Sequence, residues 1–307
     1  MTRLVRLRRS PYLGLVARLS DRLPENASGD FFVDSSCIDC ETCRRLAPST
    51  FVRSRRAGQS VVAAQPTDEA SRARALMALV ACPTSSIGTA HRAGVRAAAR
   101  RFPERVVDEI YDCGYASPDS YGASSWLIRR PGGNVLVDSP RAARPLLDRL
   151  RELGGVRLLF LSHRDDVADH ARFAEVFGCT RVMHRRDLGP DTRTVEQVVD
   201  GDDPVRLDDD LVLVPVPGHT RGSLALLHGP HLFTGDHLWA DEDTGELDAG
   251  RSVCWYSFSE QTRSMERLLS LDFTHVFPGH GRPYVAPSPS AMRDALARLI
   301  ARMRAIR

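Results

Sequence analysis

Three of the seven cysteines lie close together in the spacing C-x2-C-x2-C, at Cys37, Cys40 and Cys43. A fourth, Cys82, comes much later in the chain and is directly followed by Pro83. Thiolates are the ligands that iron–sulfur clusters require, and three near ligands with one remote ligand suit a single cubane cluster. A four-cysteine zinc site is the alternative, but zinc sites usually place their cysteines in two C-x2-C pairs. The spacing therefore predicts one [4Fe–4S] cluster.

This pattern resembles that of bacterial ferredoxins over about residues 30–89. In two-cluster ferredoxins the run is C-x2-C-x2-C-x3-C-P, and its fourth cysteine serves the second cluster. Here Ala47 stands at the fourth position and is still followed by Pro48, so the ligand for a second cluster is missing. The resemblance implies a small α+β ferredoxin-like domain with one cluster, which we place with its linker at residues 30–101.

The second half of the chain contains four apolar runs, and each one leads to a residue type that binds metals. These residues are His163, His219, Asp236 and His280, and the last three each follow a glycine. A strand fixes the backbone, and glycine allows the tight turn that points the next side chain into a shared cleft. A single histidine after a strand is more often a core or surface group. Four repeats of the arrangement favour a metal site.

These motifs resemble those of the metallo-β-lactamase superfamily, over about residues 104–284. The matching segments are Pro217-Gly-His219, Thr234-Gly-Asp236 and Pro278-Gly-His280, and Asp138 closes an early strand as the first motif requires. The resemblance implies an α/β fold, an αββα sandwich that holds one or two metals at the edge of its sheets. We assign this domain to residues 102–307, including a closing C-terminal helix. Asp138 is expected to support the ligands from behind.

The second motif of the superfamily, His-x-His-x-Asp-His, is irregular in this chain. Asp165 replaces the second histidine, and the pair Asp169–His170 lies two residues later than usual. We prefer a two-residue loop extension that still presents Asp169 and His170 to the metals. The alternative makes Asp166 the ligand and leaves Asp169 at the start of a helix, where the helix dipole stabilises it.

The preferred interpretation gives two metal sites that share one carboxylate. One site comprises His163, Asp165 and His219, the other comprises Asp169, His170 and His280, and Asp236 bridges them. Two such ions lower the pKa of bound water towards neutrality and so provide a nucleophile. We assign Asp169 a catalytic role, in which it orients this nucleophile or accepts a proton.

The resemblance implies a metal-dependent hydrolase of a small ester-type or thioester-type substrate that uses a metal-bound hydroxide. A carboxylate at Asp165 is a harder ligand than imidazole and moves the preference of the first site away from zinc and towards iron or manganese. We therefore expect two divalent metals, zinc or iron, with manganese as a third option. One alternative is an oxidoreductase, similar to flavo-diiron proteins, whose two irons receive electrons from the cluster. Another is a redox-sensing binding protein with a degenerate metal site. In each case the cluster could have a redox partner.

The composition sets limits on the function. The 307 residues suggest about two domains. The sequence contains no lysine, which excludes phosphate-loop and Schiff-base chemistry. A net charge of +3 with scattered arginines does not indicate nucleic-acid binding. No apolar run is long enough to cross a membrane.

Several other segments receive default interpretations. We interpret residues 1–29 as a basic N-terminal arm rather than an export signal, and therefore expect a cytoplasmic protein. We expect residues 241–243 to form an exposed acidic loop. His237 is expected to face solvent or to support the ligands, and Trp255 with Tyr256 to lie in the core or in the pocket wall.

Overall fold

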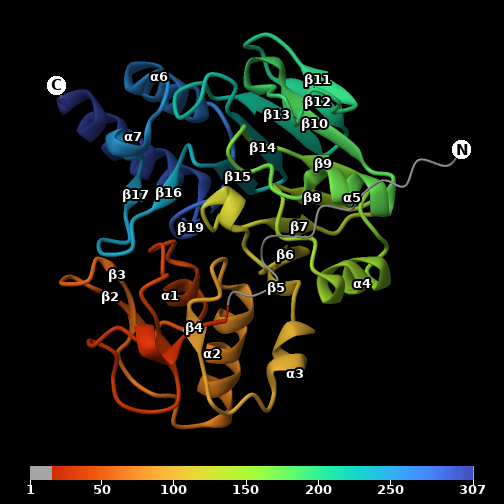
Figure 1. Cartoon of the computed structure of the whole chain (residues 1–307). Coiled ribbons are helices and arrows are strands. Elements are labelled where there is room, and N and C mark those ends of the chain that lie inside the picture. Colours follow the sequence, from red (N-terminus) through yellow and green to blue (C-terminus); the bar gives the residue numbers. More distant parts are fainter. Residues whose placement is uncertain (1–15, 307) are drawn as a thin grey trace, which may run out of the picture.

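The computed structural model describes residues 16–306. A small domain, red to orange in Figure 1, lies beside a larger sandwich coloured yellow to blue. The first fifteen residues of the predicted N-terminal arm lie outside the described residues. None of the described helices is long and apolar enough to cross a bilayer.

The small domain combines three helices with two short antiparallel strand pairs. Its strands are β1 (Phe32–Val33) paired with β4 (Ile87–Gly88), and β2 (Phe51–Ser54) paired with β3 (Gln59–Val62). Its helices are α1 (Thr42–Leu46), α2 (Glu69–Ala81) and α3 (Val95–Ala99). α2 begins at a capping box, in which the Asp68 side chain accepts a hydrogen bond from the Ser71 backbone at 2.7 Å.

Part of the predicted arm belongs to this small domain, so the boundary drawn after residue 29 is wrong. The Asn26 side chain accepts hydrogen bonds from the backbone N–H groups of Val33, at 3.0 Å, and Val62, at 2.9 Å. It also donates to the carbonyl of Val33 at 2.8 Å. Asn26 and the neighbouring Leu23 are buried. This amide therefore joins β1 to β3, which a count of basic residues could not reveal.

The larger domain contains two large sheets that pack face to face and a short antiparallel pair, β16 (Trp239–Ala240) with β17 (Leu247–Asp248). The first has the order β11-β10-β9-β8-β7-β6-β5 and the second β12-β13-β14-β15-β18-β19. The strands of the first are β5 (Glu104–Val107), β6 (Ile110–Asp112), β7 (Trp126–Ile128), β8 (Val135–Val137), β9 (Leu158–Phe160), β10 (Thr180–His184) and β11 (Gln197–Val199). Those of the second are β12 (Val205–Asp208), β13 (Leu211–Pro215), β14 (Leu224–His228), β15 (His231–Gly235), β18 (His275–Pro278) and β19 (Tyr284–Val285).

Alternation along the strands divides the apolar side chains between two cores. In β7, Trp126 and Ile128 enter the core between the sheets, whereas Leu127 faces the opposite side. This period of two is what a strand between two apolar layers requires. Phe233 and Phe277 close the inter-sheet core from the second sheet, with ring centroids 5.2 Å apart.

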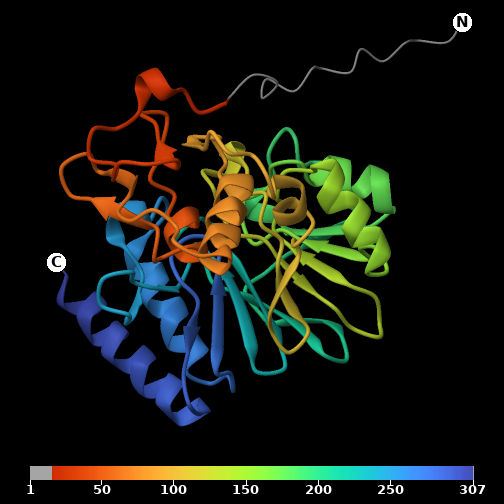
Figure 2. The same cartoon turned by 90° about the horizontal axis from the view of Figure 1, so that it is seen from below.

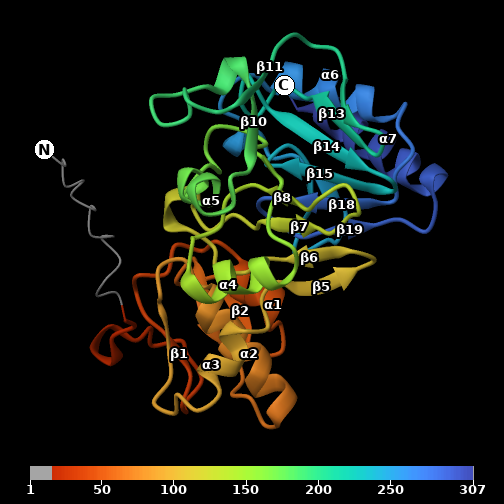
Figure 3. The same ribbon diagram turned by 90° about the vertical axis from the view of Figure 1, so that its right-hand side faces the viewer.

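Helices cover both outer faces of the sandwich. α4 (Arg144–Glu152) and α5 (His170–Phe177) lie on the first sheet, and α6 (Phe258–Leu268) and α7 (Pro289–Ala305) on the second. Figures 2 and 3 show the two sheets between these helix pairs. The predicted αββα sandwich, preceded by a small ferredoxin-like domain, is therefore confirmed.

The two domains share a core and an ion-pair network. Side chains of the small domain and of the first sheet's outer layer form one buried apolar cluster. At the opposite edge of this contact, Glu242 pairs with Arg44 at 2.9 Å and with Arg282 at 2.6 Å. Arg282 also reaches Glu41 at 2.7 Å. Glu242 is thus an interdomain contact, and the default assignment of residues 241–243 to an exposed loop is wrong for it.

Candidate metal centre

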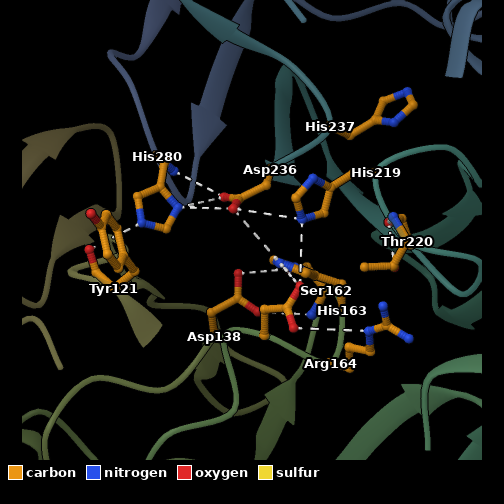
Figure 4. A network of polar contacts seen from close by, with 12 residues as sticks. Tyr121, Asp138, Ser162, His163, Arg164, His219, Thr220, Asp236, His237 and His280 are labelled. Carbon is orange, nitrogen blue, oxygen red and sulfur yellow. Dashed lines mark hydrogen bonds and ion pairs between the residues drawn. The ribbon is translucent and has the colours of Figure 1, made fainter. Parts of the chain in front are cut away.

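The four ligand types predicted from the strand ends converge at one edge of the sandwich. His163 follows β9, His219 follows β13, Asp236 follows β15 and His280 follows β18. Figure 4 shows these four side chains turned towards a common space, although they come from two sheets. The predicted convergence rests on the parallel pairing of β15 with β18 and on the face-to-face sheets.

Two imidazoles and one carboxylate form the first ligand group. The ligand atoms of His163, His219 and Asp236 all lie within 4.8 Å of one another. The Nε2 atoms of both histidines are 3.8 Å from Asp236 Oδ2. Asp165 lies at the same place, with Oδ2 3.9 Å from His163 Nε2 and 3.7 Å from His219 Nε2. The predicted grouping of Asp165 with the two histidines therefore matches the geometry.

A second group comprises Asp166, Asp236 and His280, again with all ligand atoms within 4.8 Å. Asp236 belongs to both groups, and its two oxygens each lie 2.9 Å from His280 Nδ1. Asp236 thus occupies the shared position predicted for it. The two groups can accommodate two cations side by side with Asp236 between them.

The preferred interpretation of the irregular motif is wrong, because neither Asp169 nor His170 belongs to these groups. Asp169 accepts a hydrogen bond from the Ala142 backbone at 2.7 Å. His170 opens α5 and directs Nδ1 to the guanidinium of Arg181 at 3.2 Å, a positive neighbour that opposes a cation. The turn before α5 places Asp166 at the centre instead, as the alternative interpretation required. With Asp169 turned away, its assignment as the catalytic residue also loses its geometric basis.

Buried polar atoms without partners test whether the site suits cations. Among residues 16–306, both carboxylate oxygens of Asp166, Nε2 of His163 and both ring nitrogens of His219 are buried without a hydrogen-bond partner. Leaving such groups unsatisfied costs about 1–3 kcal/mol each. Carboxylate oxygens and imidazole nitrogens are common ligands of Zn²⁺ and Fe²⁺ in proteins. The residues present therefore fit divalent metals.

The electrostatics of the two carboxylates differ although both are buried. Burial, reinforced by the charges of Asp236 and Asp138, raises the pKa of Asp166 well above its ordinary value. Burial also opposes ionisation of Asp236, but His280 outweighs it, with help from His163, and holds the pKa of Asp236 below the ordinary range. Burial lowers the pKa of His163 to about 4. A neutral imidazole is the form that binds a metal.

Asp138 supports His163 through a serine. It accepts hydrogen bonds from Ser162, at 2.7 Å from the backbone nitrogen and 2.9 Å from Oγ. Ser162 Oγ in turn lies 2.9 Å from His163 Nδ1, which leaves Nε2 facing the ligand group. Such contacts behind a ligand fix its tautomer and ring orientation. The supporting role expected for Asp138 matches this arrangement.

Asp187 is a supporting residue that the sequence did not indicate. It ends the short helix η3 (Arg185–Asp187) and is buried. Its carboxylate accepts hydrogen bonds from Gly222 N, at 2.8 Å, and from Thr220 Oγ1, and so braces the turn after His219. The same carboxylate accepts from the backbone of Arg164 at 3.1 Å. No motif precedes Asp187, so only the folded chain reveals this role.

Gly279 allows the two carboxylates to approach each other. A Cβ atom at this position would lie 2.7 Å from both Asp166 Oδ2 and Asp236 Oδ1. Any side chain would therefore occupy space that the ligands use. The close approach of these two carboxylates therefore requires the glycine of the Pro278-Gly-His280 motif.

The remaining predictions around the centre have mixed outcomes. His237 is fully buried and points away from Asp236 in Figure 4, so the surface interpretation is wrong. Trp255 and Tyr256 are exposed by 61% and 47%, which excludes the core. The Trp255 ring centroid lies 6.2 Å from that of His219, and on the other side Tyr121 lies 6.3 Å from His280. Aromatic rings therefore flank the centre.

The four predicted cluster ligands meet in the small domain. Cys37, Cys40, Cys43 and Cys82 line one cavity. Burial, with the charge of Cys82, raises the pKa of Cys40 to about 11, and burial likewise raises the pKa of Cys43. Four cysteine sulfurs gathered in one cavity fit a cluster whose iron ions bind them as thiolates.

Comparison with known proteins identifies both parts of the chain. Residues 33–89 match the family model "4Fe-4S single cluster domain of Ferredoxin I". The chain is similar in structure to VMB-1, with a TM-score of 0.51 at 15% identity over 66% of this chain and 96% of that one. It is also similar to the DIM-1 metallo-β-lactamase, with a TM-score of 0.50 at 16% identity over 65% of this chain and 95% of that one.

Residues 33–89 thus match a single-cluster ferredoxin domain, and the larger domain has the metallo-β-lactamase fold. A hydroxyacylglutathione hydrolase of Shewanella loihica is 30% identical over 172 residues, which are 50% of this chain and 60% of that protein. A hydroxyacylglutathione hydrolase of Aliivibrio fischeri is 26% identical over 163 residues. The chain spans about 60% of the length of these curated relatives.

Proposed function

We propose that the protein is a metal-dependent hydrolase of a small ester or thioester. The observation that carries the proposal is the pair of ligand groups that share Asp236. Two bound divalent cations would supply a water of lowered pKa and polarise the substrate carbonyl. The relatives named hydroxyacylglutathione hydrolase support an acyl substrate of this kind.

The proposed ligands differ from the sequence prediction in that Asp166 replaces Asp169 and His170. His163, Asp165, His219 and Asp236 would hold one cation, and Asp166, Asp236 and His280 the other. The chain's own residues prepare this set before any metal binds, because Ser162 orients His163 and Asp187 braces the turn that carries His219. In this proposal Asp166, and not Asp169, orients the nucleophile or accepts a proton.

Substrate would enter between the exposed aromatic rings. Tyr121 on one side and Trp255 on the other provide flat apolar walls for an acyl group. Arg221, whose guanidinium lies over the Tyr256 ring at 5.9 Å, adds a positive charge on the Trp255 side. The rim therefore suits a substrate that combines an apolar acyl part with an anionic part.

A hydrolysis assay tests the proposal. Zinc-loaded protein with an intact cluster should release thiol from a small acyl thioester, and Asp236→Asn should abolish that release. Cys82→Ser should retain most of the activity, because the thiols of the small domain do not touch substrate in this proposal. Equal rates for the wild type and Asp236→Asn would refute it.

A further inference from the structure

One loop of the sandwich contacts both the cluster cysteines and the metal centre. It runs from residue 116 to residue 124 and includes the short helix η2 (Pro118–Ser120). At its start, Ala116 N donates to the carbonyl of Ala81, the residue before Cys82. At its end, Ser124 N donates to the carbonyl of Gly279, the residue before His280, at 2.7 Å.

Gly122 brings this loop against a cluster ligand. A Cβ atom on Gly122 would lie 2.5 Å from Cys40 Cβ and 2.8 Å from Cys40 Sγ. The two residues can therefore be in contact only because glycine has no Cβ atom. The φ angle of Gly122 is +90°, a conformation that also favours glycine. Thr42 stabilises this contact by hydrogen bonds to both residues. Its Oγ1 donates to the Gly122 carbonyl at 3.2 Å and accepts from Cys40 Sγ at 3.5 Å.

Tyr121, the preceding residue, contacts a proposed metal ligand. Its carbonyl accepts a hydrogen bond from His280 Nε2 at 3.4 Å, as Figure 4 shows. His280 Nδ1 faces Asp236 at 2.9 Å. A single peptide, Tyr121–Gly122, therefore separates the sulfur of Cys40 from the imidazole of His280. Gly122 is buried, and the ion pairs of Glu242 connect the two domains.

We propose that the Tyr121–Gly122 peptide conducts single electrons between the cluster and a redox-active metal at the His280 site. This function goes beyond hydrolysis and rests only on the metal centre of the proposed function. The His280 site suits iron, because Asp166, Asp236 and His280 offer carboxylate oxygens and an imidazole nitrogen, which are ligands that iron accepts.

The transfer step within the chain moves one electron from the cluster to the metal. A reduced [4Fe–4S]⁺ cluster loses one electron and becomes [4Fe–4S]²⁺, and one ferric ion at the centre gains it and becomes ferrous. No bond forms or breaks, and no proton is required. The electron enters the cluster from an external one-electron donor of the ferredoxin or flavin class.

The experiment uses the full chain with its cluster, loaded at the centre with ⁵⁷Fe that is then oxidised to the ferric state. Photoreduced deazaflavin supplies less than one electron per chain. Cluster absorbance follows the cluster, and freeze-quenched Mössbauer spectra follow the ⁵⁷Fe. We expect the electron to pass from cluster to ferric ion at a rate independent of protein concentration. Zinc-loaded protein should keep it on the cluster, with a persistent electron paramagnetic resonance signal.

Substitution of Gly122 tests the route. Gly122→Ala should remove the concentration-independent phase, because its Cβ forces the loop away from Cys40. Gly58→Ala is the matched control, since Gly58 also has positive φ but has no described atom within 4 Å of the position that an alanine Cβ would take. If Gly122→Ala fails to hold its cluster, Thr42→Val weakens the same contact while retaining the glycine, and it should slow the transfer.

Three results would overturn the proposal. They are a transfer rate proportional to protein concentration, equal rates in Gly122→Ala and Gly58→Ala, and a centre that retains no iron after loading. An inactive hydrolase with intact transfer would contradict the proposed hydrolysis alone. Hydrolysis by the zinc-loaded protein, together with no transfer in the ⁵⁷Fe-loaded protein, would contradict the electron path alone.

Discussion

Replacement of Asp166 by asparagine should weaken the binding of one of two metal ions, whereas the same change at Asp169 should weaken neither. Asp166 presents two buried oxygens to the centre, and neither has a hydrogen-bond partner within the described part of the chain. The Asp169 carboxylate accepts from Ala142 N instead, a role that an asparagine oxygen can fill. The chemical change is thus identical in the two variants, and only the position differs.

The size of the effect follows from the ligand geometry. Loss of a residue behind a ligand weakens metal binding about 10–100-fold, so loss of a ligand should cost at least about 100-fold. At a free metal concentration of about 100 times the wild-type dissociation constant, that site adds about 2.7 kcal/mol to the free energy of unfolding. A site about 100-fold weaker adds only about 0.4 kcal/mol under the same condition. Asp166→Asn should therefore lose about 2.3 kcal/mol of metal-dependent stability.

The assay combines metal analysis with urea unfolding, both at fixed free zinc. Wild type and Asp169→Asn should each bind about two zinc ions per chain, and Asp166→Asn at most about 1.5, because a site weakened about 100-fold is half occupied at this zinc concentration. The ion that Asp166→Asn retains in full belongs to the group of His163, His219 and Asp236, which does not use Asp166. Loss of an ion from Asp169→Asn with retention in Asp166→Asn would refute the ligand assignment.

Three further predictions concern the surroundings of the centre. Ser162→Ala should weaken metal binding about 10–100-fold in a zinc titration, because it removes the hydroxyl that connects Asp138 to His163. An unchanged zinc affinity would show that this connection is dispensable. In metal-free protein, burial raises the pKa of Asp138 to about 7, so between about pH 4 and 7 the folded state keeps a proton that the unfolded state releases. The free energy of unfolding should therefore fall as the pH rises through this range. Asp138→Asn should reduce that fall, and an unchanged pH profile would count against it. Glu242→Gln should lower the free energy of unfolding, measured in urea, by about 1–3 kcal/mol, whereas a change at the exposed Asp243, Asp243→Asn, should not. Equal effects of the two substitutions would contradict a stabilising role of Glu242 between the domains.

The strand-end positions of His163, His219, Asp236 and His280 could be predicted because they depend on local features. An apolar run followed by glycine and then histidine or aspartate specifies a strand, a turn and the residue beyond it. The hairpin of β7 and β8 follows from the same kind of pattern, with Pro131-Gly-Gly133 between two apolar runs. The cluster motif is similarly local, except for Cys82.

The register of residues 163–170 could not be predicted, because the extra residues can be accommodated on either side of the ligand. The chain places the irregularity after Asp166, where Ala168 adopts a φ of +26°. That choice depends on Ala142 and Arg181, which hold Asp169 and His170 from other elements. Neither contact can be predicted from the residues next to Asp169 and His170 in the sequence.

Contacts between the domains were missed for the same reason. Gly122 lies in a polar loop and carries no motif, yet its lack of a side chain permits the contact with Cys40. Glu242 belongs to an acidic run that would ordinarily face solvent, and its two arginine partners are distant in sequence. Such roles arise only when the two domains pack.

Anomalous X-ray diffraction from crystals of anaerobically purified protein tests the central claim most directly. Data at the iron and zinc edges should show one compact cluster among Cys37, Cys40, Cys43 and Cys82, and two separate ions on either side of Asp236. An ion beside His170, or the absence of any ion next to Asp236 in metal-replete crystals, would contradict the account.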